Sequence, residues 1–228
     1  QPPGSQGLVE NCRVHDISDK GVSVGEGAIF VTVKGSLFYR CGAGIAVKDS
    51  SVSEIYNSTF YGCEYGIELV EKNPGLGGGH GTAYNNILWN NGGSIYMNSD
   101  ATLAMSYSNV QGAVADTVQH ISVVDPLFMD PANDDFQLQP GSPMIGQGIN
   151  GEDLGAIFPA GGIAAPSDEL QLGLPNATSV LVVDSALQVY WAAGPLISSV
   201  DVLFSTDGGS SWTMIATSVP AQQLSTSW

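Results

Sequence analysis

The hydrophobic positions in the first half of the chain recur in short alternating runs with a regular spacing. A glycine precedes an apolar residue at the same point of three runs, at Gly21, Gly44 and Gly66, and Ser94 takes its place in a fourth. The steps between these positions are 23, 22 and 28 residues. Alternation indicates strands and not helices. A repeat of this size is typical of a solenoid, in which stacked units bury a shared core.

Stacking the repeats places similar residues in the same column. Six residues before the glycine stand Phe38, Phe60 and, in the fourth repeat, Leu88. The first repeat has His15 at this position, but a shift by one residue would place Val14 in the apolar column. We therefore predict a β-bulge in the first repeat.

Two further columns carry sulfur or amide groups. Cys41 and Cys63 stand three residues before the glycine, which predicts Cα atoms within disulfide range on adjacent turns. We favour free buried thiols, with a disulfide as the alternative, because parallel neighbours have poor torsions for a bridge. Nine or ten residues before the glycine stand Asn11, Gly35, Asn57 and Asn85. We expect these asparagines to form an inward hydrogen-bonded ladder at a turn.

The repeat pattern predicts five coils, each one turn of the solenoid, at about residues 7–28, 29–51, 52–81, 82–101 and 102–124. Residues 125–158 are dense in Asp, Pro, Gly and Asn, which stop a strand ladder. An open strand edge at the end of a solenoid must be covered, and we predict that this segment covers it. The predicted fold class is all-β, with a parallel β-helix and its C-terminal cover over residues 1–158.

The end of this region resembles a known group of proteins. SYSNVQG, followed by DPLFMDPANDDFQLQPGSPMIGQG and DLGAI, is similar to the C-terminal end of right-handed parallel β-helix proteins of the broad pectate-lyase-like group, which bacteria and archaea export. The resemblance covers residues 7–158 and implies an extracellular or cell-surface location. It also implies that the Gly-Ile runs form the first sheet and that the asparagine column lies at the turn between the second and third. The resemblance selects no activity, because the group contains lyases, hydrolases and proteins without known chemistry.

A different pattern follows. Residues 159–173 are predicted as a linker by composition. Residues 174–228 contain short alternating strands with turns between them, which predicts a β-sandwich with Trp191 in its core. STDGGSSW predicts a hairpin around Asp207, pinned by Trp212. This part resembles a fibronectin type III or immunoglobulin-like module, and about 55 residues are too few for seven strands, so we expect a partial module.

The charge of the chain is acidic and unevenly distributed. The formal net charge is −16, and all six basic residues lie in the first 72 positions. Such a surface repels nucleic acid and anionic membranes. The chain contains no apolar run of the length, about 18 residues, that a membrane-spanning helix needs. We therefore expect neither nucleic-acid binding nor insertion into a membrane.

Because successive side chains of a strand point to opposite faces, the sequence also predicts which residues of the first sheet point outward. They are Ser23, Ala46, Glu68 and Tyr96, with Gly25, Lys48 and Asn98 further along the strands. Glycosidases need two carboxylates, and calcium-dependent lyases need a carboxylate cage. Because the first of these rows carries one carboxylate, we expect binding of a polysaccharide or cell-surface glycan and not catalysis. The candidate contact residues on this face are Lys48, Glu68, Tyr96 and Asn98.

Two other segments supply candidate ligands. The insertion VEKNPGLGGGHG lengthens the third coil beside the outer face, and Glu71, Lys72 and His80 are its candidate binding residues. The alternative is a mobile solvated loop. Asp130, Asn133 and Asp135 could hold calcium. We favour carboxylates that accept hydrogen bonds within turns, and no other cofactor is expected.

These patterns predict a non-catalytic extracellular fragment with a structural or adhesive role. The sequence opens at Gln1 almost directly in a repeat, without a signal peptide, and closes at Trp228 within an apparent strand, so we expect a piece of a longer exported protein. The first alternative is a fragment of a polysaccharide lyase or glycoside hydrolase whose catalytic coils lie elsewhere. The second is a fibre subunit that self-assembles when the incomplete sandwich accepts a strand from a neighbour.

Overall fold

The computed structural model describes residues 4–25, 27–28, 30–98, 100–156, 170–174, 188–193, 197–208, 210–221 and 225–227. It divides into two compact units, and each is considered by itself. The first unit contains Gln1–Leu127 and Gly141–Ile157, and the second contains Phe128–Pro140 and Phe158–Trp228. None of the helices in the described residues is long and apolar enough to cross a membrane.

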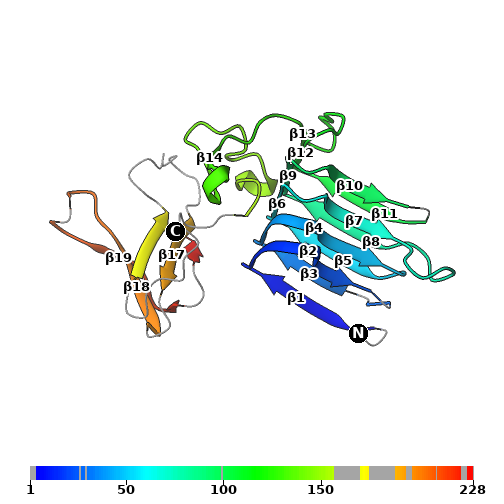
Figure 1. Ribbon diagram of the computed structural model, residues 1–228. Coiled ribbons are helices and arrows are strands. Elements are labelled where there is room, and N and C mark those ends of the chain that lie inside the picture. The colour runs from blue at the N-terminus through cyan, green and yellow to red at the C-terminus, as the bar shows by residue number, and fades with distance from the viewer. Residues whose placement is uncertain are drawn as a thin grey trace. The chain divides into compact units, whose positions relative to one another are not determined.

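The first unit is a stack of parallel strands in two sheets (Figure 1). One sheet contains one strand from each coil, running in order along the stack from the blue to the green end of the ribbon. Its members are β1 (Gln6–Glu10), β3 (Phe30–Lys34), β5 (Val52–Tyr56), β8 (His80–Tyr84) and β11 (Thr102–Ser106). Every pair of neighbours is parallel. This arrangement confirms the predicted parallel β-helix.

The second sheet contains the Gly-Ile runs, which the sequence analysis assigned to the first sheet. Its strands in the first two coils are long, and each of these becomes two shorter strands in later coils. Its members are β2 (Arg13–Val24), β4 (Leu37–Lys48), β6 (Thr59–Tyr61), β7 (Tyr65–Val70), β9 (Ile87–Trp89), β10 (Gly93–Met97), β12 (Ser108–Val110) and β13 (Ile121–Ser122). The register pairs Val14 with Phe38, Phe38 with Phe60 and Phe60 with Leu88. It shifts between Ile17 and Lys20, which confirms the predicted bulge.

The glycine column lies where the apolar rings of the core pass close to the backbone. Phe38, Phe60 and Leu88 are fully buried in one core cluster. A Cβ atom at Gly21 would stand 2.8 Å from the Gly44 carbonyl oxygen, and one at Gly44 would stand 2.4 Å from Cδ1 of Phe60. Real Cβ atoms do not approach this closely, so the stacked core excludes any larger side chain at these positions.

The asparagine column forms a turn but not the ladder that we expected. Asn11, Gly35, Asn57 and Asn85 all adopt the left-handed conformation, with φ of 52°, 55°, 47° and 55°. Asparagine and glycine tolerate this conformation best. The inward ladder is built one residue later, by Ser36, Ser58, Asn86 and Ser108. The backbone N–H groups of Ser36, Ser58 and Asn86 each donate to the side-chain oxygen of the ladder residue in the next coil, at 3.2, 3.0 and 3.1 Å. The prediction of an asparagine ladder was therefore wrong by one position.

Residues 141–156 attach to the side of the coils and include the short 3₁₀ helix η2 (Ile149–Gly151). The side-chain amides of Asn57 and Asn85 both donate to Oε2 of Glu152, each at 3.0 Å. The backbone N–H of Gly155 donates to the Asn85 carbonyl at 2.8 Å, and that of Ala156 donates to Oγ1 of Thr59 at 2.9 Å. We expected a cover over the end of the stack, whereas these bonds hold the segment against the turn column of the third and fourth coils.

The second unit contains three small antiparallel sheets. The hairpin β14 (Phe128–Asp130) and β15 (Asp135–Leu138) flanks the 3₁₀ helix η1 (Pro131–Asn133). A three-stranded sheet joins β16 (Leu170–Leu174), β17 (Gln188–Ala193) and β20 (Ser225–Ser227). A two-stranded sheet joins β18 (Ser199–Phe204) and β19 (Thr213–Pro220). The strand β16 begins inside the predicted linker 159–173, the rest of which lies outside the described residues.

The core of the second unit contains the predicted tryptophan. Trp191 is buried with Val189, Val200 and Ala221, and its indole Nε1 donates to the Ala221 carbonyl at 2.9 Å. The hairpin around Asp207 is also present, and its carboxylate accepts bonds from the backbone N–H and the hydroxyl of Ser211. These bonds, led by that from the Ser211 side chain, lower the pKa of Asp207 to about 2. Trp212 was expected to pin the hairpin, but it is largely exposed.

Candidate functional site

The outer face of β2, β4, β7 and β10 carries the row of side chains that alternation predicted. The register places Ser23 beside Ala46, Ala46 beside Glu68, and Glu68 beside Tyr96. Tyr96 is 42% exposed and Glu68 is partly exposed. Ala46 is fully buried, because a methyl group flanked by strands of two neighbouring coils has little surface left. The accessible part of this row is therefore Ser23, Glu68 and Tyr96.

Tyr65 joins this surface, although the sequence did not indicate it. Its ring centroid lies 5.0 Å from that of Tyr96, and the two planes are tilted by 36°. Tyr65 pairs in register with Gly93, which leaves room for its ring, since a Cβ at Gly93 would stand 3.0 Å from Cδ1 of Tyr65. Because Gly93 was not part of any predicted column, alternation alone could not place this aromatic pair.

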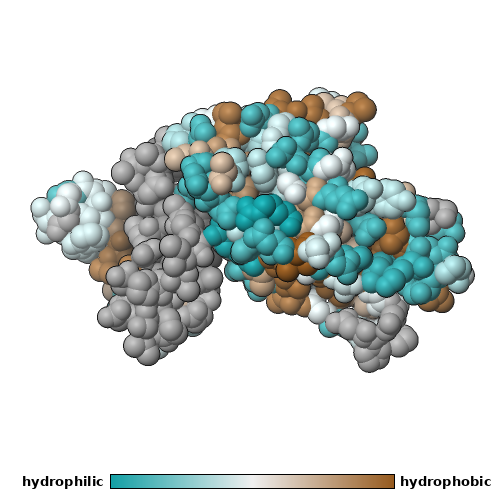
Figure 2. All heavy atoms as spheres, viewed as in Figure 1, coloured by the Kyte–Doolittle hydropathy of each residue, from teal (hydrophilic) through white to brown (hydrophobic). Residues whose placement is uncertain are grey.

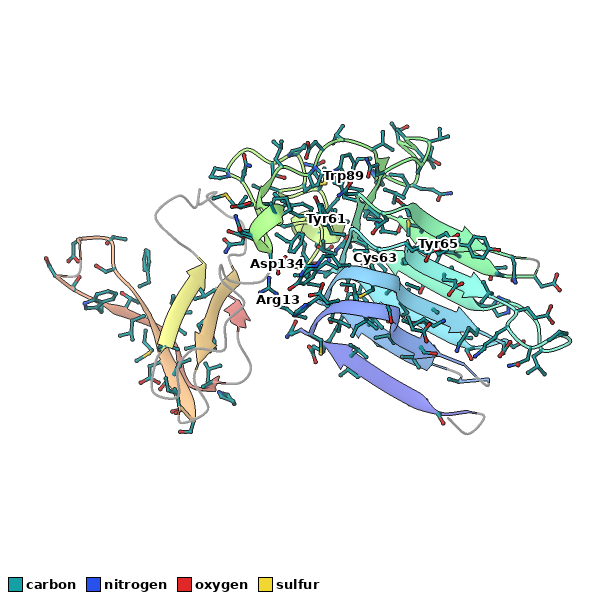
Figure 3. The ribbon with its side chains drawn as sticks, viewed as in Figure 1. Arg13, Tyr61, Cys63, Tyr65, Trp89 and Asp134 are labelled. Atoms are coloured by element: carbon teal, nitrogen blue, oxygen red, sulfur yellow. The ribbon has the colours of Figure 1, made fainter. Side chains whose placement is uncertain are left out.

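A second aromatic row on this sheet was missed. Tyr39, Tyr61 and Trp89 are paired in register on β4, β6 and β9, and Figure 3 labels Tyr61 and Trp89 on the third and fourth coils. Tyr61 and Trp89 are partly exposed, whereas Tyr39 is buried. The sequence carried one signal for this row. Each of the three aromatic residues directly follows a residue of the inward apolar column, namely Phe38, Phe60 or Leu88.

The first two coils place charged groups around Tyr39. His15 stacks on its ring, with centroids 4.6 Å apart and planes 13° apart, and the Arg40 guanidinium lies 4.6 Å from the ring centroid. Arg40 also donates to both oxygens of Asp16, at 2.6 and 2.9 Å, and Nδ1 of His15 lies 2.7 Å from the same carboxylate. The bonds from Arg40 and then from His15 hold the pKa of Asp16 well below its usual value.

The candidate residues of the insertion are held by local hydrogen bonds. The carboxylate of Glu71 accepts from the backbone N–H groups of Gly75 and Gly77, at 2.6 and 3.1 Å. The side chain of Asn98 bonds to both the backbone N–H and the carbonyl of Glu71. Nδ1 of His80 lies 2.9 Å from Oγ1 of Thr102. These polar groups already have partners within the protein, so the insertion is a structured loop.

Asp49, which lies in the coil before the insertion, holds the insertion in place through hydrogen bonds. Its carboxylate accepts from the backbone N–H groups of Lys72 and Asn73, at 2.8 and 2.9 Å, and from the Asn73 side chain at 2.6 Å. Burial of Asp49 opposes its ionisation, but the bonds from Asn73 and Lys72 outweigh that effect and lower the pKa of this carboxyl. The Lys72 side chain is exposed and is the one predicted insertion residue that projects into solvent.

The residues predicted as calcium ligands form hydrogen bonds within their own turn. Asp130 accepts a bond from the Asn133 side-chain amide at 2.7 Å, and Asp135 accepts one from the Gln137 backbone N–H at 3.1 Å. Carboxylates commonly do this in turns. Over the described ranges, no group of three or more His, Cys, Asp or Glu side chains is placed to hold a metal ion. Asp130, Asn133 and Asp135 therefore stay a prediction without geometric support.

The first unit thus defines a parallel β-helix whose second sheet presents aromatic and charged side chains outward. In agreement, the model of a family described as the right-handed β-helix region matches residues 3–122. The chain belongs to this right-handed β-helix family. Comparisons with curated proteins and with solved structures found no match. The family fixes the fold and its hand, while the activity, the location and the kinship of the second unit to fibronectin-like modules stay predictions.

Proposed function

We propose that this protein is a non-catalytic β-helix protein of the cell surface or extracellular space that contacts polysaccharide through the outer face of its second sheet. The observation that carries the proposal is the outward pair Tyr65 and Tyr96, with ring centroids 5.0 Å apart and Glu68 beside Tyr96. Aromatic faces supply apolar contact area at little entropic cost, while a neighbouring carboxylate accepts hydrogen bonds from hydroxyl groups.

The second aromatic row extends the same surface. Tyr61 and Trp89 lie on the strands β6 and β9 that precede β7 and β10 in their coils. A chain of sugar units that ran along the strands of one coil could meet aromatic groups at both positions of the sheet. Over the described residues, the side of the β-helix seen in Figure 2 is mostly hydrophilic with smaller hydrophobic areas between. Such a mixture suits a hydrated polymer better than a protein partner with a large apolar interface.

A glycan-array screen of the full chain tests the proposal. We expect Tyr96→Ala and Trp89→Ala each to weaken binding of the selected glycans by about 2- to 13-fold, since one aromatic contact contributes about 0.5–1.5 kcal/mol. Tyr56→Ala is the matched control, because Tyr56 and Tyr84 form a similar pair, 4.8 Å apart, on the other sheet. Equal losses for Tyr56→Ala and Tyr96→Ala, or no glycan bound at all, would refute the proposal.

A second function, self-assembly by strand complementation, is favoured by one feature of the second unit. A groove of about 610 Å³ lies over its core, lined mainly by apolar side chains that include Trp191, Val202 and Trp212. The strand β18 pairs only with β19 among the described strands. An added strand from another molecule could satisfy this edge and cover the groove.

The assembly proposal predicts oligomers or fibres whose formation depends on the groove. Light scattering during size-exclusion chromatography would measure this. Val202→Asp is expected to abolish assembly because it places a charge on the apolar wall. Monomers over a wide concentration range for the unmodified protein would exclude it.

A further inference from the structure

The core of the β-helix is partly uncovered at its last coils. Met97 on β10 is the register partner of Leu69 on β7, and Leu69 is fully buried, yet Met97 is 40% exposed. Ile95 is also partly exposed, whereas its register partner Ile67 is fully buried. Register partners on adjacent strands point to the same face of a sheet, so both residues of β10 belong to the core face. Over the described residues, the core therefore stays open to solvent at this end.

The two strands at this end also have unpaired edges. Among the described strands, β10 pairs only with β7, and β11 pairs only with β8. Both lie at the end of the stack opposite to β1 (Figure 1). The segment 141–156, which was expected to cover this end, bonds instead to the turn residues Asn57 and Asn85. The free backbone N–H and C=O groups of an edge strand form a template for another strand. A protein strand is therefore the kind of occupant that this end fits.

The sequence of these strands offers no protection against such pairing. They read GSIYM in β10 and TLAMS in β11, without a charged residue or a proline. Natural proteins protect solvent-exposed edge strands with charges, prolines or bulges. This chain is rich in acidic residues, with a net charge of −16, and yet none of them stands in either strand. An uncharged edge in so acidic a chain indicates a surface that a partner covers.

The strand β11 is complementary to a second copy of itself. In an antiparallel pair centred on Ala104, Leu103 would face the partner's Met105, and Thr102 would face the partner's Ser106. Leu103 and Met105 both pack against the core, so the apolar pairs would lie on the core side. The hydroxyl pairs would lie on the outer side, because side chains alternate along a strand. A contact in which one patch meets its own copy is the form that a two-fold axis requires.

We propose that this end face, formed by β10 and β11, is the interface of a homodimer. In it, β11 pairs antiparallel with β11 of a second copy about a two-fold axis at Ala104. The pairing joins the two five-stranded sheets into one continuous sheet, and it covers the open core at Ile95 and Met97. An isologous contact of this kind closes at two copies. It is independent of the groove in the second unit and of glycan binding.

Sedimentation velocity of the full chain over a wide concentration range tests the dimer. The buffer contains about 0.15 M salt, which screens the repulsion between two acidic copies. We expect a reversible species of twice the mass of one chain. Ala104→Lys should weaken it at least about tenfold, because two like charges would face each other at the axis. Since Ala104 is exposed, this variant should fold as a monomer, which circular dichroism would verify.

A matched control places the same charge one coil away from the edge. Thr82 on β8 is exposed and is the register partner of Ala104, so Thr82→Lys should dimerise like the unmodified protein. Mixing Ala104→Lys with Ala104→Glu should restore dimers, because opposite charges directly across a strand pair attract each other.

Three results would overturn the proposal. They are monomers of the unmodified protein at every concentration, equal losses in Ala104→Lys and Thr82→Lys, and a dimer that Ala104→Lys leaves intact. Val202→Asp, which changes the groove of the second unit, should stop only the growth of larger assemblies. Loss of the dimer in that variant would assign the contact to the groove and refute the end-face interface.

Discussion

The rings of Phe38 and Phe60 stack face to face on adjacent coils, with centroids 5.0 Å apart and planes within 6° of each other. The separation is close to the distance between neighbouring strands, about 4.8 Å. Both rings are fully buried. The distance between coils therefore sets the spacing of this core stack, and each ring packs against the ring of the next coil.

Replacing Phe60 tests how much the stack stabilises the β-helix. Phe60→Ala removes a ring that packs on Phe38, and buried phenylalanine truncations cost about 3–5 kcal/mol. We expect the urea midpoint to fall accordingly. Phe60→Leu, which keeps most of the volume, should cost less than half as much. A loss below 1 kcal/mol for Phe60→Ala would contradict the buried stack.

The close approach of the core to Gly44 predicts a strong effect from a single methyl group. Gly44→Ala would bring Cβ to 2.4 Å from the Phe60 ring and 2.7 Å from the Gly66 carbonyl oxygen. Overpacking of this kind costs about 1–3 kcal/mol. The control is Gly7→Ala, where the nearest atoms are 3.8 Å away. Thermal denaturation should show a lower midpoint for Gly44→Ala only, and equal effects would disprove the steric account.

Glu152 is expected to hold residues 141–156 on the coils. Both Asn57 and Asn85 donate to its carboxylate, and hydrogen bonds to a charged group contribute about 1.5–3 kcal/mol each. In Glu152→Ala we expect faster hydrogen exchange in residues 141–156, measured by mass spectrometry. Glu10→Gln, which breaks only a partly exposed ion pair with Lys34, should leave that segment protected. Unchanged exchange in Glu152→Ala would show that other contacts hold the segment.

Cys41 and Cys63 are free and buried in the structure, as the sequence favoured. The neighbouring Cys63 thiol lowers the pKa of Cys41, and its loss in Cys63→Ala should raise that pKa. Titration of the thiolate by ultraviolet absorbance would measure the change. Cys12→Ala should leave the pKa of Cys41 as it is. A pKa that does not move in Cys63→Ala would argue against an interaction between the two thiols.

The hydrogen bonds of Asp49 make the insertion sensitive to acid. The folded pKa of Asp49 is lowered from its usual 3.8. The stabilisation from its ionised form is therefore complete well above pH 3.8 and is lost as the pH falls through the lower, folded value. Amide exchange at Lys72 and Asn73, followed by NMR, should accelerate over this acid range. Asp49→Asn should abolish the pH dependence, and a variant that retained it would point to another group.

Much of the fold followed from residue spacing because a solenoid repeats its local environment. The columns of Phe38 with Phe60 and of Cys41 with Cys63, and the bulge in the first coil, each depend on a constant step between coils. The step predicts which residues become neighbours without any knowledge of loops. For the same reason Glu68 and Tyr96 could be placed side by side on the outer face before the structure was known.

The incorrect prediction of the asparagine ladder arose where an offset of one residue, or the conformation of one turn, decides whether a side chain points inward or outward. The left-handed turn at Asn57 and Asn85 directs those side chains toward Glu152, and Ser58 and Asn86 take over the inward ladder. Since side chains alternate between faces, a shift by one position exchanges inside for outside. Spacing alone does not reveal such a shift.

The sequence by itself determined that stacked parallel coils form, which faces are apolar, and that positive charge is confined to the first 72 residues. Only the tertiary structure decided that Tyr65 meets Tyr96, that Lys48 is largely buried, and that the insertion is held by Asp49. These relationships depend on loop paths and on the room left by glycines in neighbouring coils. They are properties of contacts between coils, which a repeat pattern does not specify.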